Sequence, residues 1–406
     1  MFNRFLFLSI DGMTDQLGQS QVLPYLIGLS GKGYRISIVS CEKEVNFEKN
    51  KDIIHPLVVK HNITWHYSFY QNKIPIVSQL QNFFSLRKIA IKEVKANRNT
   101  VLHCRSYLPA LIGLQLKKKF NCKYIFDMRG FWADERIDGN IWRLKNPIHS
   151  ILYKYFKRKE IELVENADYI VTLTNCAKKE VQGWKIKALP IITVIPCCAD
   201  INHFTISNEE DKVVTKTKLN IPENAFVVGY LGAIGTWYML NEMLDFFAEL
   251  KKQKRNAVLF FVTADDKERI LRSALEKSIL PSSIIIQPAK RNEVPQFIST
   301  FTIGLFFIKP LYSKKGSSPT KLAELLACGI PVVCNMGIGD CDTIIIENKV
   351  GVAIPDFTVA SYQKAIEAID VFLSIPAQHF RDVALNNFSL EKGVEEYEVI
   401  YKYLLN

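Results

Sequence analysis

The sequence has no hydrophobic run long enough to cross a membrane. Its first apolar stretch, residues 5–10, ends at Asp11, and its longest, residues 297–308, includes Ser and Thr. A membrane-spanning helix needs ~20 apolar residues, and the apolar part of a signal peptide needs roughly 7 to 15. We therefore expect a cytoplasmic protein in which residues 297–308 contribute a core strand.

Metal-binding and nucleic-acid-binding signatures are also missing. The nine cysteines form no C-x-x-C pair and no Cys/His spacing typical of a zinc site. Several lie within apolar runs, so we interpret them as reduced core thiols of a cytoplasmic protein. No zinc finger, helix-turn-helix or RNP-like segment occurs, which argues against nucleic acid as a partner.

The sequence does have an asymmetric charge. The formal net charge is +11, and residues 1–200 hold roughly 30 Lys and Arg against roughly 17 Asp and Glu, whereas residues 201–406 are slightly acidic. Residues 83–92 and 152–159 mix basic with aromatic and aliphatic side chains, as basic helices on anionic membranes do. Either these helices contact the inner face of the plasma membrane, or they are ordinary solvated helix faces.

Alternating strand and helix patterns predict two α/β domains. At 406 residues the chain is too long for one typical core, and after a polar segment at residues 201–225 the pattern restarts with a new strand. We assign residues 1–200 to an N-terminal Rossmann-like domain, residues 201–385 to a C-terminal Rossmann-like domain, and residues 386–406 to a helix that packs back on the first. Ligands of parallel sheets bind at the carboxyl ends of the strands, so we expect both domains to face a central cleft.

Residues 317–333, SSPTKLAELLACGIPVV, are the most informative segment. Ser318 is a natural N-cap with Pro319 at the first helical position, and Gly329 ends the helix before a buried strand. Lys321 is then a cation in the first turn, where it opposes the helix dipole. A capping box would have Glu or Gln at that position. An anion bound at the start of the helix would remove this conflict.

Other groups in the same segment would favour such an anion. The hydroxyls of Ser317, Ser318 and Thr320 lie beside the first N–H groups of the helix, and Glu324 follows one turn later on the same face. At ~1.5 Å per residue, Glu324 sits roughly 8 Å past the cap, about the distance from a diphosphate to the ribose diol of a nucleotide. The segment therefore predicts a nucleotide site. The alternative is an ordinary capped helix with a solvated Lys/Glu pair.

Taken in order, several motifs resemble one enzyme family. SPTKLAELLACGIPVV resembles the nucleotide-binding segment of GT-B glycosyltransferases of the retaining family-four type, and DQLGQSQVLPYL resembles the first glycine loop and helix of bacterial members that build surface polysaccharides. FDMRGFWADE, VTLTN, VIPCCADINHF and GYLGAIGTWY follow in the family's order and spacing. The resemblance covers essentially the whole chain and implies the GT-B fold.

The resemblance implies a donor site in the C-terminal domain. Glu324 matches the ribose-binding Glu of the family's E-x7-E motif, but the position of the first Glu is Gly316, which leaves the contact to the donor sugar open. Ser317, Ser318, Thr320 and Lys321 would take over the diphosphate, and Gly18 would let the backbone approach the donor.

A second departure concerns the basic residues that hold the diphosphate. Thr236 and its two neighbours stand where relatives carry an Arg and a Lys. Arg291, Lys309, Lys314 and Lys315 are candidates for the missing charge, and spacing alone does not choose between them. No DxD metal motif is present, so we expect no cofactor and no metal, with electrostatic stabilisation from cations and helix dipoles instead.

A second candidate site follows a buried strand in the N-terminal domain. Many relatives carry a His near Asp127 and Arg129, and a guanidinium cannot act as a base, although it can hold phosphate or carboxylate with two hydrogen bonds. Retaining enzymes of this class are thought to need no protein nucleophile. We therefore expect Asp127, Arg129 and Lys321 to support catalysis through charge, unless the Asp–Arg pair is purely structural. His103, Arg105 and Trp132 would lie on the acceptor side.

These features predict a hexosyl- or related glycosyltransferase. It would move a sugar from a nucleoside diphosphate sugar to a lipid-linked or saccharide acceptor with retention, in capsule, O-antigen or exopolysaccharide synthesis. A nucleotide-sugar epimerase is one alternative, with His103 as thin support for acid/base chemistry. A non-catalytic nucleotide-sugar-binding protein is the other, and Gly316 and Thr236 would favour it.

Overall fold

The computed structural model describes residues 4–72, 75–97 and 100–406. It divides the chain into two compact units, the first formed by residues 1–196 and 390–406 and the second by residues 197–389. The chain passes between the units after Pro196 and again after Ser389. The sequence analysis placed these two changes at residues 200–201 and 385–386.

The first unit is built on a parallel sheet with strand order β3-β2-β1-β4-β5-β6-β7. The strands are β1 (Arg4–Leu8), β2 (Arg35–Glu42), β3 (Thr64–Phe69), β4 (Val101–Arg105), β5 (Tyr124–Asp127), β6 (Tyr169–Thr172) and β7 (Ile192–Val194). In β1 Phe5 lies opposite Ile36 on one side and Val101 on the other, so the strand order reverses between β1 and β4. Ligands of such sheets bind at this reversal.

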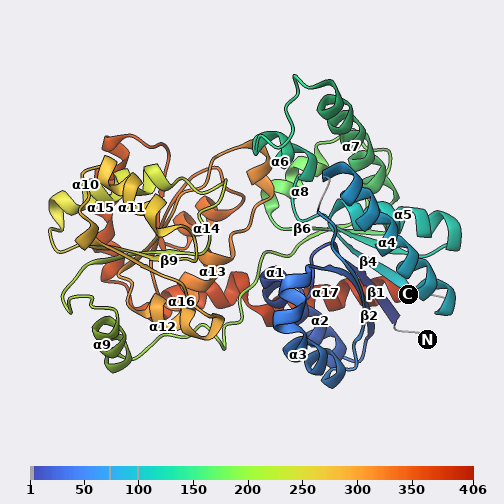
Figure 1. Cartoon of the computed structure of the whole chain (residues 1–406), viewed down its shortest axis with the longest axis horizontal. Helices are drawn as coiled ribbons and strands as arrows, with labels where there is room; N and C mark the ends of the chain where they lie inside the picture. Colours follow the sequence, from blue (N-terminus) through green and yellow to red (C-terminus); the bar gives the residue numbers. More distant parts are fainter. Residues whose placement is uncertain (1–3, 73–74, 98–99) are drawn as a thin grey trace. The chain divides into compact units, whose positions relative to one another are not determined.

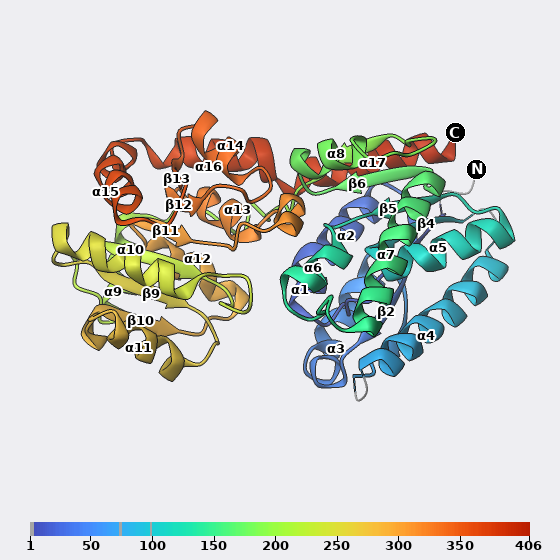
Figure 2. The same ribbon diagram turned by 90° about the horizontal axis from the view of Figure 1, so that it is seen from above.

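Helices cover both faces of this sheet (Figures 1 and 2). They are α1 (Gln16–Gln21), α2 (Leu23–Gly31), α3 (Glu44–Lys60), α4 (Pro75–Ala96), α5 (Tyr107–Phe120), α6 (Trp132–Asp138), α7 (Pro147–Asn166), α8 (Asn175–Gln182) and α17 (Leu390–Leu405). The helices α4 and α5 pack against β1, β2, β4 and β5, while α17 packs along α2. Because helices cover both faces of the sheet, β4 is buried along its whole length and β1 from its second residue onward.

The second unit repeats the same arrangement with strand order β10-β9-β8-β11-β12-β13. The strands are β8 (Val227–Leu231), β9 (Val258–Val262), β10 (Ile284–Gln287), β11 (Ile303–Phe306), β12 (Val332–Asn335) and β13 (Gly351–Ile354). The α-helices are α9 (Glu209–Lys218), α10 (Leu240–Gln253), α11 (Lys267–Glu276), α12 (Val294–Ser299), α13 (Thr320–Ala327), α14 (Cys341–Glu347), α15 (Val359–Leu373) and α16 (Ala377–Phe388). Short 3-10 turns occupy Pro281–Ser283, Arg291–Glu293 and Tyr312–Gly316.

The predicted fold class is confirmed, since each unit is a parallel α/β sheet of Rossmann-like order. The polar segment at residues 201–225 contains the helix α9, which has Asn208 accepting at its N-cap and Glu209, Glu210 and Asp211 in its first turn. The acidic side chains of this first turn lie at the helix N-terminus, where the helix dipole favours negative charge. No helix in the described part of the chain has the length and hydropathy to span a membrane.

Candidate functional site

The helix α13 of the second unit begins without a side-chain cap. Pro319 occupies the N-cap position, and the Oγ atom of Ser318 accepts a hydrogen bond from the backbone N–H of Cys197 at 3.1 Å. The prediction that Ser318 caps the helix is therefore wrong, because this hydroxyl holds another loop. Ser317 and Thr320 lie half-buried on either side of this turn. The helix start keeps the N–H groups that an anion would bind.

Lys321 is buried in this helix start instead of solvated. Its side chain is 5% exposed, and its Nζ atom lies 3.5 Å from the ring centroid of Tyr238 and 4.1 Å from that of Tyr230. Among the described residues, Nζ has no hydrogen-bond partner. Cation–π attraction to two rings offsets part of the desolvation cost. Even so, burial lowers the pKa of Lys321 well below its usual value, although Glu324 and Asp265 oppose the shift.

Glu324 lies one turn along the same helix and is half-buried. Burial raises its pKa to about 7, against the opposing charges of Arg291 and Lys321. The alternative of a solvated Lys/Glu pair is therefore excluded for Lys321, which is buried. A buried ammonium and a carboxylate of raised pKa, one helical turn apart, are typical of a site that a polar ligand completes.

The loop after β8 forms the other wall of this site. Gly232 and Gly235 have φ angles of +94° and +49°, which L side chains rarely adopt. The carboxylate of Asp265 accepts a hydrogen bond from the N–H of Ile234 and so fixes the loop. The loop continues into Tyr238, whose ring covers Lys321. Since β8 and β11 are neighbours at the reversal of strand order, this loop lies where α/β sheets bind ligands.

The four basic candidates differ in their relation to this loop. Lys314 is buried, with its Nζ atom 3.6 Å from the ring centroid of Trp237, and the charge of Arg291 acts on Glu324. Lys309 and Lys315 are exposed, and so is Thr236. Arg291 is therefore linked to Glu324 through its charge, and Lys314 to the residue that follows Thr236.

In the first unit, charged side chains meet at the carboxyl ends of β4 and β5. The Oδ2 atom of Asp127 lies 3.6 Å from His103 Nε2 and 3.9 Å from Arg105 Nη1, and its Oδ1 atom lies 3.8 Å from Arg129 Nη1. Burial alone would raise the pKa of Asp127, but Arg129, the contact with His103 and Arg105 together hold it below its usual value. Arg105 Nε also donates to Asp11 at 3.3 Å. Four of the predicted residues thus form one cluster.

The backbone is strained at both strand ends. Arg129 has φ = +56° and Ser106 has φ = +69°, and neither is a glycine. Such conformations cost on the order of 1–3 kcal/mol each and concentrate at functional sites. The N–H of Ser106 donates to the carbonyl of Asp127 at 2.7 Å, so the two strained turns are tied together.

Gly18 has a structural reason to be glycine. A Cβ atom there would lie 2.1 Å from the carbonyl oxygen of Gly12. The same loop is held by the buried carboxylate of Glu42, which accepts from the N–H groups of Met13 and Thr14 at 2.7 and 3.0 Å. Close packing of the loop on itself explains Gly18, and its predicted contact with a donor stays a prediction.

Trp132 does not join the charged cluster. It begins α6 and packs against Tyr107, Trp142 and Phe156, with the guanidinium of Arg136 4.7 Å from its ring centroid. Its position indicates a role in holding α6 on α7, and its predicted acceptor contact stays a prediction.

Family models match both halves of the chain. The model described as "Glycosyl transferases group 1" matches residues 211–375, and that described as "Glycosyltransferase Family 4" matches residues 22–203. Each half of the chain thus matches a glycosyltransferase family. The group 1 match contains β8 to β13 with Lys321 and Glu324, and the family 4 match contains His103, Asp127 and Arg129.

The curated relatives of this chain are distant in sequence. An uncharacterised glycosyltransferase of Methanocaldococcus jannaschii is 21% identical over 62% of this chain and 63% of its own length. A putative teichuronic acid biosynthesis glycosyltransferase of Bacillus subtilis is 26% identical over 52% of this chain and 49% of its own. The matches therefore span between half and two thirds of these relatives.

Solved structures share the fold along the whole chain. A glycosyltransferase from Rickettsia africae has a TM-score of 0.72 at 16% identity, with all of both chains covered. The Anabaena protein HepE in complex with UDP has a TM-score of 0.69 at 15% identity, covering 98% of this chain and 100% of its own. At such low identity these structures support the fold alone.

The sequence analysis did not connect the predicted residues with the partners that surround them. Tyr230, Tyr238 and Asp265 belong to strands and loops far from Lys321 in sequence. Asp265 could have been found, since it follows β9 as Asp127 ends β5, and polar residues at strand ends are the usual signal. The tyrosines carried no such signal, because aromatic residues in and after a strand are typical of a core.

Proposed function

We propose that this protein transfers a sugar from a nucleoside diphosphate sugar to a saccharide or lipid-linked acceptor, with retention of anomeric configuration. The buried ammonium of Lys321, without a hydrogen-bond partner among the described residues, carries the proposal. A diphosphate at the start of α13 would supply both the missing partner and the counter-charge. Glu324, one turn away, would then receive the ribose hydroxyls.

The chemistry of the first unit favours transfer over epimerisation. An epimerase needs an acid and a base that reach the sugar, yet His103 and Asp127 are each only 1% exposed. The strained Arg129 is better suited to hold anionic or hydroxyl groups than to move protons. We propose that Arg129 orients the acceptor or stabilises charge, that no protein nucleophile is needed, and that no metal takes part. The comparison proteins that bind UDP and UDP-glucose make a UDP-sugar the first donor to test.

The proposal is tested by incubating the protein with a panel of UDP- and GDP-sugars, with and without a bacterial membrane lipid extract. Acceptor-dependent release of nucleoside diphosphate is expected, and NMR of the product should show the donor's anomeric configuration. Isomerised sugar without release would support the epimerase. Binding without turnover would support a non-catalytic binding protein.

The raised pKa of Glu324 predicts a pH dependence of donor binding. The carboxylate accepts ribose hydroxyls best when ionised, so affinity should rise as pH increases through about 7, where Glu324 loses its proton. We expect UDP-glucose to bind several-fold more tightly at pH 8 than at pH 6, as measured by calorimetry, and Glu324→Gln to bind weakly with no rise. UDP-glucose suits this test because its diphosphate does not titrate in this range. A wild-type affinity that is flat in pH would contradict the assignment of Glu324.

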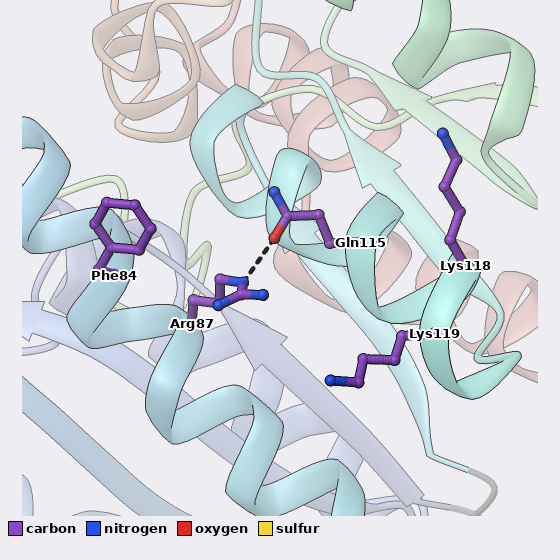
Figure 3. Close-up of a pocket in the computed structure, with 5 residues that line it drawn as sticks. All are labelled: Phe84, Arg87, Gln115, Lys118 and Lys119. Atoms are coloured by element: carbon purple, nitrogen blue, oxygen red, sulfur yellow. Dashed lines mark hydrogen bonds between the residues drawn. The ribbon is translucent and has the colours of Figure 1, made fainter.

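We also propose that the first unit docks on an anionic membrane surface. Exposed apolar side chains recur along one side of α4, at Val77, Leu80 and Phe84, and again at Ile148, Ile151 and Tyr155 on α7. Exposed cations lie on the same two helices, Lys88 on α4 and Lys154 and Arg158 on α7. Figure 3 shows Phe84 and Arg87 on α4 beside Lys118 and Lys119 on α5, with Arg87 Nε donating to Gln115 at 2.6 Å. Apolar stripes edged by cations are complementary to anionic headgroups and acyl chains.

Vesicle binding tests this surface. The wild type should co-sediment with vesicles rich in phosphatidylglycerol and not with phosphatidylcholine vesicles. The double change Ile148→Asp and Ile151→Asp should reduce binding at least tenfold, because it places charge in the apolar stripe. Val371→Asp in the second unit, where the side chain is 63% exposed, is the matched control. Equal binding to both vesicle types would overturn the proposal.

A further inference from the structure

The helix α17 brings two tyrosines to the charged cluster of the first unit. The hydroxyl of Tyr397 donates to Asp127 Oδ2 at 3.2 Å, and that of Tyr401, one turn later, lies 2.9 Å from His103 Nδ1. Both rings are almost fully buried, and Tyr401 stacks on Phe5 of β1 with centroids 3.6 Å apart. The last helix of the chain therefore reaches the strand ends where Arg129 lies.

The protonation state of His103 determines which of its ring nitrogens donates and which accepts a hydrogen bond. Burial lowers the pKa of His103 and keeps its ring neutral, so only one ring nitrogen carries a proton. We assign Tyr401 as the donor to Nδ1, which places the proton on Nε2, facing Asp127 Oδ2 at 3.6 Å. One oxygen of Asp127 is thereby held from the side of α17 by the hydrogen bond of Tyr397. Tyr401 acts less directly, because it fixes the ring of His103, whose Nε2 lies near the same oxygen without a hydrogen bond among the described residues.

The other oxygen of Asp127 faces Arg129, the residue proposed to orient the acceptor. Oδ1 is buried, has no hydrogen-bond partner among the described residues, and lies 3.8 Å from Arg129 Nη1. Arg129 itself has a left-handed backbone and is followed by Gly130 at φ = +125°. A strained residue keeps its conformation only where its surroundings determine it. The Asp127 carboxylate, whose orientation the residues of α17 fix, is one of the groups that determine the conformation of Arg129.

We propose that Tyr397 and Tyr401 are positioning residues for glycosyl transfer: through the Asp127 carboxylate they set the place of the Arg129 guanidinium. This inference rests on the proposed function for its kinetic consequences. The geometry explains why α17 carries tyrosines at positions 397 and 401. Phenylalanine would fill the same space but would lack the hydroxyl groups that reach Asp127 and His103. The geometry also assigns a role to His103, the histidine that the sequence analysis left open.

The charges around Asp127 determine what removal of a hydroxyl does. Arg105, Arg129, His103 and Tyr397 face the carboxylate, and Asp11 reaches it only through Arg105. A hydrogen bond to the ionised form favours that form. Tyr397→Phe should therefore raise the pKa of Asp127 and move the acid limb of the kcat/KM profile for the acceptor upward by roughly 0.5 to 1 pH unit, the shift expected for one lost hydrogen bond.

Kinetics of Tyr397→Phe against Tyr403→Phe test the inference. Tyr403 lies on the same helix, is 52% exposed and packs on Tyr169, so its variant is the matched control. We expect Tyr397→Phe to raise the acceptor KM about fivefold, as the loss of one hydrogen bond implies, with the donor KM unchanged. Tyr403→Phe should behave as wild type. A lower melting temperature with unchanged acceptor KM and pH profile would show a purely structural role and overturn the inference.

A second readout does not depend on activity. The 15N signal of Arg129 Nε in the unliganded protein should shift, and its N–H should exchange faster with solvent, in Tyr397→Phe but not in Tyr403→Phe. An unchanged Arg129 signal would overturn the inference even if transfer is observed. If the Arg129 signal changes but the protein transfers no sugar, the link from Tyr397 to Arg129 is supported and the proposed function is rejected.

Discussion

Replacing Lys321 by methionine should strongly weaken donor binding and at the same time stabilise the unliganded protein. Methionine keeps the length of the side chain and removes a buried ammonium that has no hydrogen-bond partner among the described residues. A charge-assisted contact to a diphosphate is worth about 1.5–3 kcal/mol, so the affinity for UDP-glucose should fall by roughly 10- to 150-fold. The melting temperature should rise by about 2 °C, because the free-energy cost of desolvating the cation exceeds the cation–π attraction to the two tyrosine rings.

A variant that merely damaged the fold would lose both donor affinity and stability. Lys321→Met is instead expected to lose affinity and gain stability. Lys251→Met is the control, since Lys251 lies in the same unit, bonds the carbonyl of Ala257 at 2.8 Å and faces the ring of Phe247. It should bind nucleotide as the wild type does. Thermal unfolding with and without UDP-glucose measures both effects. Undiminished binding by Lys321→Met would remove the observation on which the donor site rests.

Replacing Arg129 by lysine should lower sugar transfer by roughly 100- to 1,000-fold and leave donor binding unchanged. Lysine keeps the positive charge beside Asp127 but lacks the planar fork that holds two acceptor atoms at once. Loss of one well-placed donor to a reacting group costs about 3–4 kcal/mol in other enzymes. Because the charge remains, the free energy of unfolding should change by less than about 1 kcal/mol, as is usual for substitutions that create no cavity and no unpaired buried charge.

Steady-state kinetics with the donor and acceptor varied separately measure this effect. Arg136→Lys is the matched control, because Arg136 follows in the adjoining helix and packs over Trp132 instead of facing Asp127. It should retain wild-type turnover. Turnover by Arg129→Lys within threefold of wild type would contradict any role for the guanidinium at the acceptor.

The sequence was sufficient for the fold because most of its strands are runs of mainly apolar residues. The strand β9, for example, is apolar throughout and lies between turn and charged residues. The strand β3 carries no such signal, because its side chains are at most half-buried and alternate with polar residues at the sheet edge. Edge position is a property of the sheet and cannot be read from six residues.

The candidate site was predictable only in part. Lys321 was identified because it breaks a local rule of helix capping, and Asp127 and Arg129 because they follow a buried strand. The burial of Lys321 was not predictable, since Tyr230 and Tyr238 reach it from a different strand and loop. In the same way, Tyr397 meets Asp127 across 270 positions of sequence. Local patterns locate such residues, and tertiary packing decides what surrounds them.

A crystal structure of the protein with a bound nucleoside diphosphate tests the central claim most directly. We predict that the diphosphate lies at the start of α13, with a phosphate oxygen within about 3 Å of Lys321 Nζ, as a charge-assisted hydrogen bond requires. The ribose hydroxyls should contact Glu324. A nucleotide bound elsewhere, with Lys321 still enclosed by Tyr230 and Tyr238, would contradict the account.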